Sequence, residues 1–200
     1  RRSPGFLRLV DASGIESFWD DDLARFHKGA SAIDSLHAVR AFRDARTAFP
    51  GRFSYTGLSF ILFTPWTSLP GLHANLGILG VLGLTDAGNL FEARARLHDD
   101  LALTALAEHE GLLADDEDDP LLVTNRRKLF GHERAWRYAD ARLRPLSRVA
   151  LRLDLLDRAD VDDPLSIQLR QRLAAAPGVA DRRGRIELAR ALVEVALSDD

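Results

Sequence analysis

The alternation of apolar and polar positions predicts successive units in which a strand is followed by a loop and a helix. The apolar run 6–11 is typical of a short buried strand. A run of Asp after Phe18 and Trp19 favours a short helix. Ser31 with Asp34 has capping-box spacing, and the helix behind it should stop at 50–51. Its apolar stripe recurs at helical spacing: Ile33, Leu36, Val39 and Phe42.

A second unit begins with the run 58–63, whose aromatic and branched residues predict a strand. The segment 64–67 forms the turn, and Thr67 or Ser68 is placed to cap a helix with Pro70 in its first turn. Gly77 and Gly80 weaken that helix, and Gly83 is placed as its C-terminal cap. The expected inner stripe is Leu69, Leu72, Leu76 and Leu79.

A third unit combines a strand over 89–98 with a helix over 100–109 that Gly111 closes. Strands that alternate with helices through short connections predict parallel pairing in right-handed βα units. Three units are too few to close a barrel. We therefore expect an α/β fold, an incomplete parallel (β/α) barrel of about three βα units followed by a helical tail.

The composition changes after residue 113. The acidic run 115–119 favours a solvated linker over a metal site, and we divide the chain into a half-barrel (1–113), an acidic linker (114–131) and a helical C-terminal appendage (132–200). Helices are expected over 132–157 with a kink at Pro145, over 164–175 and over 185–197, with a packing stripe of Leu146, Val149, Leu153 and Leu156.

Charge and composition narrow the function classes. The net charge of −3, with 46% apolar and 28% charged residues, is ordinary for a globular protein and indicates no nucleic-acid or membrane surface. No apolar run reaches about 18 residues, so we expect a cytoplasmic protein without a membrane span. The absence of Cys excludes disulfides, thiolate metal sites and a thiol nucleophile within these residues. The absence of Met favours a truncated sequence that lacks an upstream half.

Three common catalytic motifs are missing. His132-Glu133 has Trp136 where a zinc-protease helix needs its second His. The glycines over 77–83 lack the Lys-Ser/Thr ending of a phosphate loop, and no Gly-x-Ser-x-Gly elbow occurs. The six His residues form no metal pattern, so we predict no metal ligands in this chain.

Polar residues at the expected strand ends are the candidates for binding, because parallel α/β folds bind ligands beyond the carboxyl ends of their strands. Glu16 could accept hydrogen bonds from sugar hydroxyls or an ammonium group, or could instead cap the next helix. Trp66 and Phe63 could stack on an aromatic base, or could belong to the core. Further strand-end candidates are Ser17, Thr64, Thr67, Arg96, His98, Asp99 and Asp100.

Three segments in the same order resemble the radical SAM enzymes, particularly the class often paired with a cobalamin-binding domain. The segment 14–17 with Leu23, Phe26, Lys28 and Gly29 is similar to that family's fourth strand and its sequel. The most specific match, 60–67 with Leu69, Leu72 and Asn75, resembles the fifth strand and its helix. The looser match, 90–97 with Leu103 and 110–113, resembles the sixth.

The resemblance implies the second half of a partial barrel in which S-adenosylmethionine is cleaved at a four-iron cluster to a deoxyadenosyl radical. It implies cofactor contacts from Glu16, Ser17 and the segment Phe63, Thr64 and Pro65. Their positions at the strand ends make Trp66, Arg96 and His98 the candidates for substrate contacts. The resemblance also makes cobalamin a candidate cofactor. The cluster loop CxxxCxxC and the Gly-Gly-Glu motif are absent, and 99–101 replaces a Gly-Thr-Pro type turn.

Two hypotheses about the function of the chain follow. In the first, the chain is a fragment of a radical SAM enzyme that supplies part of the S-adenosylmethionine and small-molecule substrate pocket, completed by the missing N-terminal half of the barrel. On its own it should hold no iron–sulfur cluster and show no activity. In the second, it is a cysteine-free, non-catalytic scaffold or binding relative that oligomerisation completes.

Overall fold

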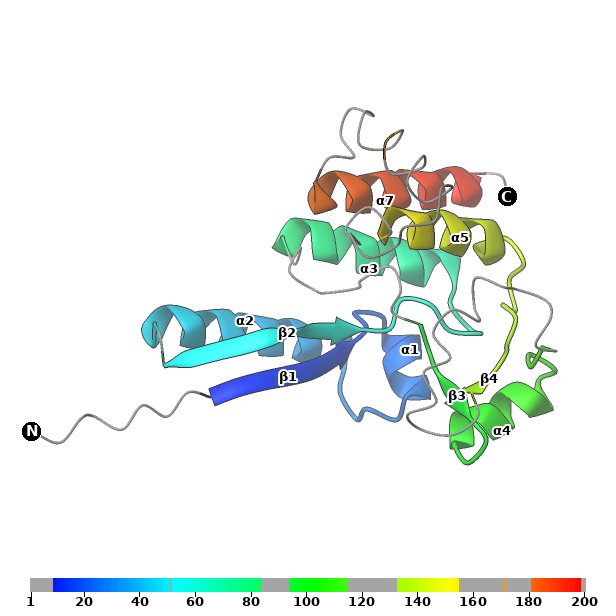
Figure 1. Cartoon of the computed structure of the whole chain (residues 1–200), viewed down its shortest axis with the longest axis horizontal. Coiled ribbons are helices and arrows are strands. Elements are labelled where there is room, and N and C mark those ends of the chain that lie inside the picture. Colours follow the sequence, from blue (N-terminus) through cyan, green and yellow to red (C-terminus); the bar gives the residue numbers. More distant parts are fainter. Residues whose placement is uncertain are drawn as a thin grey trace, which may run out of the picture.

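The computed structural model describes residues 9–50, 52–83, 94–114, 133–154, 171 and 181–198, and its first unit is a parallel strand pair with a helical crossover. β1 (Leu9–Glu16) leads into α1 (Asp20–Arg25) and α2 (Ala32–Ala48), and β2 (Phe53–Phe60) returns parallel to β1. In Figure 1, α2 lies along the two strands.

Both strands of this pair differ in bounds from the predicted ones. β1 runs on to Glu16 rather than ending at residue 11, and β2 begins at Phe53 and ends at Phe60. The pairing runs from Leu9 opposite Phe53 to Glu16 opposite Phe60. Pairing between the strands therefore sets their length, and it includes polar positions that an apolar-run criterion leaves out.

The start of α2 is as predicted. Ser31 Oγ accepts a hydrogen bond from the Asp34 backbone N–H at 3.2 Å, and the Asp34 carboxylate accepts one from the Ser31 N–H at 2.8 Å. Val39 is buried, but Ile33 is 63% exposed and does not belong to the core face. The predicted stripe is therefore correct only from the second turn onward.

The next unit continues the parallel arrangement past the end of β2. Phe63 forms a parallel bridge with Arg94, and the Ala95 N–H donates to the Phe63 carbonyl at 2.7 Å. β3 (Leu97–His98) follows. The fold is thus mixed α/β, mostly helical, with a small parallel sheet. Residues 89–93 of the expected third strand lie outside the described residues.

α3 (Leu69–Leu82) follows β2 in the sequence, and of the two predicted N-caps, Thr67 and Ser68, it has Ser68. Ser68 Oγ accepts a hydrogen bond from the Gly71 N–H at 3.1 Å, and Gly83 adopts a left-handed φ of 57°. All four leucines of the predicted inner stripe are buried. A Cβ at Gly80 would lie 3.1 Å from Glu187 Oε1 and 3.6 Å from Ile186 Cγ2, so α7 (Arg182–Ser198) packs against α3 at this glycine.

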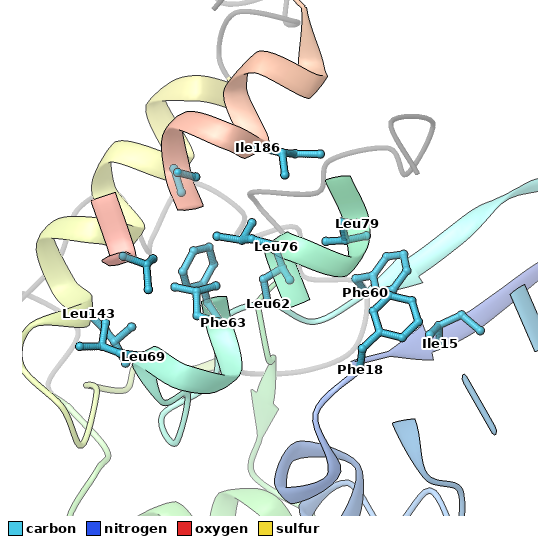
Figure 2. Packing of buried hydrophobic residues seen from close by; sticks show 14 of the residues in the cluster. Ile15, Phe18, Phe60, Leu62, Phe63, Leu69, Leu76, Leu79, Leu143 and Ile186 are labelled. Atoms are coloured by element: carbon cyan, nitrogen blue, oxygen red, sulfur yellow. The ribbon is translucent and has the colours of Figure 1, made fainter. Parts of the chain in front are cut away.

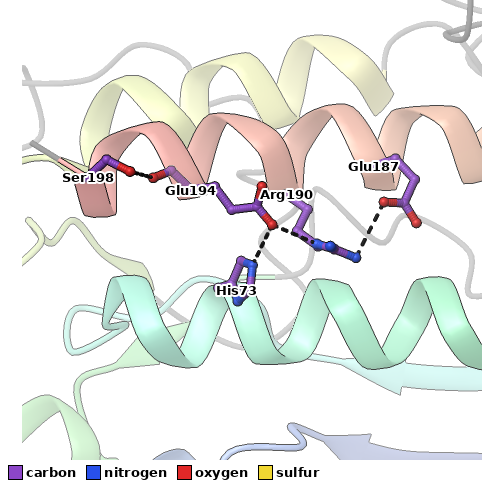
Figure 3. Close-up of polar contacts among 5 residues, drawn as sticks. All are labelled: His73, Glu187, Arg190, Glu194 and Ser198. Atoms are coloured by element: carbon purple, nitrogen blue, oxygen red, sulfur yellow. Dashed lines mark hydrogen bonds and ion pairs between the residues drawn. The ribbon is translucent and has the colours of Figure 1, made fainter.

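Polar side chains also join α3 to α7. His73 Nε2 lies 2.9 Å from Glu194 Oε1, and Arg190 Nε donates to the same carboxylate oxygen at 3.1 Å, as Figure 3 shows. Arg190 also lies 3.5 Å from the Glu187 carboxylate. These contacts are at the rim of the interface, because their side chains are about one third to one half exposed.

The predicted helix over 132–157 is wrong for its first part. β4 (Glu133–Arg134) pairs antiparallel with β3, and the Trp136 indole N–H donates to the Ala95 carbonyl at 3.0 Å. This pairing overrides the helical pattern. The helix is α5 (Leu143–Asp154), in which Pro145 lies in the first turn and causes no interior kink. α4 (Ala102–His109) and α7 agree with the predicted 100–109 and 185–197.

The described parts of the tail pack into the same hydrophobic cluster as the strands. Leu143, Ile186 and Val193 are buried in it together with Phe60 and Leu76, and Figure 2 shows several of these side chains meeting around α3. No helix in the described ranges is long and apolar enough to cross a membrane. The linker run 115–131 lies outside the described residues, as does 164–175 apart from Gln171.

Candidate functional site at the strand ends

An open cavity of about 440 Å³ lies beside the carboxyl ends of the strands. Its wall comes from α1 and the residues around it, from the turn before α3, and from one residue of α4. This is the side of a parallel sheet where α/β proteins bind ligands. The lining residues are Trp19, Asp21, Asp22, Ala24, Arg25, His27, Trp66, Ser68 and Leu106.

A buried hydrogen-bond network supports one wall of the cavity. The Ser17 hydroxyl donates to Asp22 Oδ2 at 2.8 Å, and the Asn75 amide donates to Ser17 Oγ at 3.0 Å. The Asn75 amide oxygen accepts the Phe18 N–H at 2.6 Å. Ser17, Asp22 and Asn75 are all buried. The network therefore joins the end of β1, α1 and α3, and it fixes the Asp22 side chain.

Asp22 is the buried acid of the site. Burial raises the pKa of its carboxyl above the ordinary value, and the neighbouring Asp21 carboxylate acts in the same direction. The Ser17 hydrogen bond and the Arg25 charge oppose this rise in the pKa without cancelling it. Asp22 therefore holds its proton to a higher pH than an exposed aspartate, next to a cavity open to solvent.

The Trp19 indole rests against the first turn of α3. A Cβ at Gly71 would lie 2.9 Å from Trp19 Cδ1 and 3.0 Å from Ser68 Oγ. Only a residue without a side chain leaves room for the ring at this point. Gly71 therefore positions one aromatic wall of the cavity.

A tight turn positions the second aromatic wall. The Thr64 N–H donates to Thr67 Oγ1 at 2.8 Å, and Thr67 Oγ1 donates to the Leu62 carbonyl at 3.2 Å. The Trp66 N–H donates to Thr64 Oγ1 at 3.0 Å. Because Thr64 and Thr67 are buried, this turn holds Trp66 in a fixed position at the cavity.

The Trp66 ring is in contact with two charged groups. The Arg25 guanidinium carbon lies 4.8 Å from the ring centroid, and the indole N–H donates to the Glu110 carboxylate. Arg25 Nη1 and Glu110 Oε1 lie 3.8 Å apart. Residues from α1, the β2–α3 turn and the end of α4 therefore meet at one edge of the cavity.

Glu16 lies at the end of β1, with a left-handed φ of 68°. Its carboxylate pairs with Lys28 Nζ at 3.0 Å, and its carbonyl accepts the Ile61 N–H at 2.7 Å. The N-cap of α1 is Trp19, so the interpretation of Glu16 as a helix cap is wrong. Glu16 is partly buried beside the strand end but does not line the cavity.

The other predicted cofactor contacts lie beneath the surface. Ser17, Thr64 and Pro65 are buried, and the first two act through the hydrogen bonds that fix Asp22 and Trp66. Phe63 is 3% exposed and packs among apolar side chains of α3, α5 and α7, which agrees with the alternative that it is a core residue (Figure 2). Of the predicted residues, Trp66 lines the cavity directly.

The two candidates on the third strand do not line the cavity. Arg96 is exposed. His98 is partly buried, and its Nδ1 is buried without a hydrogen-bond partner among the described residues. Sequence reasoning did not select Trp19, Asp22, Arg25 and Glu110, although the Asp run and Phe18-Trp19 marked the start of α1. What it lacked was the orientation of that short helix.

The described residues contain no group of three or more His, Asp or Glu side chains that could hold a metal ion. Because the sequence has no Cys, this chain supplies no thiolate to an iron–sulfur cluster. No protein-family model, curated protein or solved structure matches the chain.

Proposed function

We propose that the chain is the rear part of a radical SAM enzyme and that the strand-end cavity forms part of its S-adenosylmethionine and substrate pocket. The observation that carries the proposal is the cavity of about 440 Å³ beside successive parallel βα units, with two tryptophans and two aspartates in its wall. We further propose that this α/β fold is part of an incomplete barrel, in which additional strands lie beyond β1.

The cavity offers suitable partners for a nucleoside that carries an amino acid. Indole faces stack on a purine, and carboxylates accept hydrogen bonds from hydroxyl and ammonium groups. Trp19 and Trp66 provide the indole faces for stacking, and Asp21 and Asp22 provide the carboxylates that accept hydrogen bonds. Ser17 and Thr64 contribute indirectly, because they hold Asp22 and Trp66 in position.

Reductive cleavage of S-adenosylmethionine to a radical requires a four-iron cluster, which would supply this chemistry when bound. The residues of this chain do not fit that cluster, because they include no cysteine. We therefore assign to this chain only the binding and orientation of ligands. The cluster ligands would come from the N-terminal half of the barrel.

The coding DNA directly upstream of the Arg1 codon tests this proposal. An in-frame continuation that encodes a CxxxCxxC loop and a Gly-Gly-Glu turn is the expected result. A nearby start codon with no cysteine codons between would exclude the radical SAM proposal for this protein.

A scaffold completed by self-association is the second candidate. The observation behind it is that β1 pairs with β2 alone within the described residues, so a second copy would add at the same edge of β1 as the missing half. Size-exclusion chromatography with circular dichroism distinguishes the two. A well-folded oligomer formed by the 200-residue chain favours the scaffold, whereas a folded chain that associates only non-specifically through its open edge at high concentration favours a missing half.

A further inference from the structure

We infer that the strand-end cavity binds a small organic cation, held by the Trp66 and Trp19 rings and by the Asp21 and Asp22 carboxylates. This inference deepens the proposed function. The role of the cation as a substrate rests on that proposed function. The binding itself depends only on the cavity wall. Three properties of that wall support it, and they concern charge, aromatic surface and an internal cation.

The first property is the charge of the wall. Asp21 and Asp22 line the cavity, and Glu110 stands at its edge next to Trp66. The basic groups of the wall are the Arg25 guanidinium, which already lies 3.8 Å from Glu110, and the His27 imidazole. The acidic groups outnumber the basic ones, and the exposed Asp21 carboxylate is the one best placed to attract a positive ligand rather than an anion.

The second property is the aromatic surface. The face of an indole ring carries negative electrostatic potential and attracts cations within about 6 Å of the ring centre. Two of the three tryptophans of the chain line this cavity, whereas Trp136 is buried elsewhere. The same wall thus combines carboxylates with indoles, the groups that recognise organic ammonium ions.

The third property is that a cation already occupies part of this surface. The Arg25 guanidinium lies 4.8 Å from the Trp66 ring centroid, on a side chain that is about one third exposed. An external cation would compete with Arg25 for the ring and for Glu110. Removal of the Arg25 charge should therefore strengthen cation binding, while it would weaken the binding of any anion.

The test uses choline and its uncharged isostere 3,3-dimethylbutan-1-ol, which differ in charge but hardly in shape. The readout is the set of indole N–H signals in a ¹H–¹⁵N correlation spectrum of the 200-residue chain, each assigned by Trp→Phe substitution. We expect choline to shift the signals of Trp19 and Trp66 saturably and to leave that of Trp136 unchanged. The isostere should bind more weakly by about threefold or more.

Two variants give opposite expected results. Asp21→Asn should weaken choline binding by about threefold, and Arg25→Gln should strengthen it by about threefold. Asp44→Asn, which removes the same charge from the exposed surface of α2, should leave the affinity unchanged. An unshifted Trp136 signal in each variant shows that the fold is intact.

Equal binding of the isostere, weaker choline binding in Arg25→Gln, or competition by inorganic phosphate would each overturn the inference. S-adenosylmethionine serves as a separate arm of the titration. Choline binding without S-adenosylmethionine binding would count against the proposed function while leaving the cation site in place. Binding of S-adenosylmethionine without binding of choline would overturn the general cation site but would leave the proposed function in place.

Discussion

The side-chain oxygen of Asn75 lies 2.6 Å from the backbone nitrogen of Phe18 and accepts its hydrogen bond, so α3 is fixed to the chain just beyond β1. Asn75 also donates to Ser17 Oγ at 3.0 Å. One buried amide therefore satisfies polar groups on both sides of the α1–α3 contact, and the position of Asp22 depends on it.

Replacement of Asn75 tests this role. Asn75→Ala leaves the Phe18 N–H without its partner in a buried site, and we expect a loss of about 1–3 kcal/mol in the free energy of unfolding. Urea denaturation measures it. Ser59→Ala, at an exposed strand position, is the control and should change stability by less than about 0.5 kcal/mol. Equal stability of the two variants would show that the network contributes nothing.

Two glycines of the same helix should respond to alanine in opposite ways. A Cβ at Gly71 would lie 2.9 Å from Trp19, whereas at Gly77 the nearest atom, Arg190 Cδ, is 4.0 Å away. Gly77→Ala should therefore stabilise the protein by up to about 1 kcal/mol through helix propensity. Gly71→Ala should destabilise it and shift the Trp19 fluorescence. Thermal denaturation of both variants decides, and stabilisation by Gly71→Ala would contradict the described packing.

Asp22 should make stability depend on pH in a defined direction. Its folded-state pKa is raised above the ordinary 3.8, so the folded protein holds this proton more tightly than the unfolded chain. The free energy of unfolding therefore falls as the pH rises from about 3.8 through the raised pKa. In Asp22→Asn this contribution is absent, so the variant should gain stability relative to the wild type as the pH rises above about 3.8.

Urea denaturation at several pH values measures this difference, with Asp44→Asn as the control for a lost surface charge. The predicted result is a relative stability of Asp22→Asn that grows with pH, while that of Asp44→Asn stays nearly flat. A difference that shrinks as the pH rises would mean that the Asp22 carboxylate is favoured by its surroundings.

The α3–α7 interface should depend on its apolar centre more than on its ion pairs. Ile186 is fully buried, and Ile186→Ala should cost about 2–5 kcal/mol. The His73–Glu194 pair is partly exposed, so His73→Ala should cost no more than about 1 kcal/mol. Denaturation of the two variants measures both effects. A larger loss for His73→Ala would place the main stabilisation in the polar contacts of Figure 3.

The sequence predicted those elements whose limits are set locally. Ser31 with Asp34 marks the start of α2 through hydrogen bonds within a few residues, as predicted. Ser68, one of the two predicted caps, begins α3, and Gly83 ends it as predicted. Strand limits depend on distant partners. β1 reaches Glu16 because it pairs with Phe60, and residues 133–134 form a strand because β3 lies beside them.

The sequence indicated the edge of the sheet where the candidate site lies, but not most of the residues that line it. The strand-end rule selected the edge where the cavity lies, and it selected Trp66. It could not show that Ser17 and Thr64 are buried supports, because burial depends on how α1 and α3 pack. Nor could it reveal Glu110, which reaches Trp66 across 44 residues of sequence.

Binding of S-adenosylmethionine to the 200-residue chain tests the central claim most directly. Isothermal titration calorimetry should show saturable binding that is lost or strongly weakened in Trp66→Leu, with Trp66→Phe keeping part of it through the remaining ring. Circular dichroism confirms that the variants are folded. No saturable heat from the folded wild-type chain, or equal affinity in Trp66→Leu, would contradict the assignment of this cavity to S-adenosylmethionine.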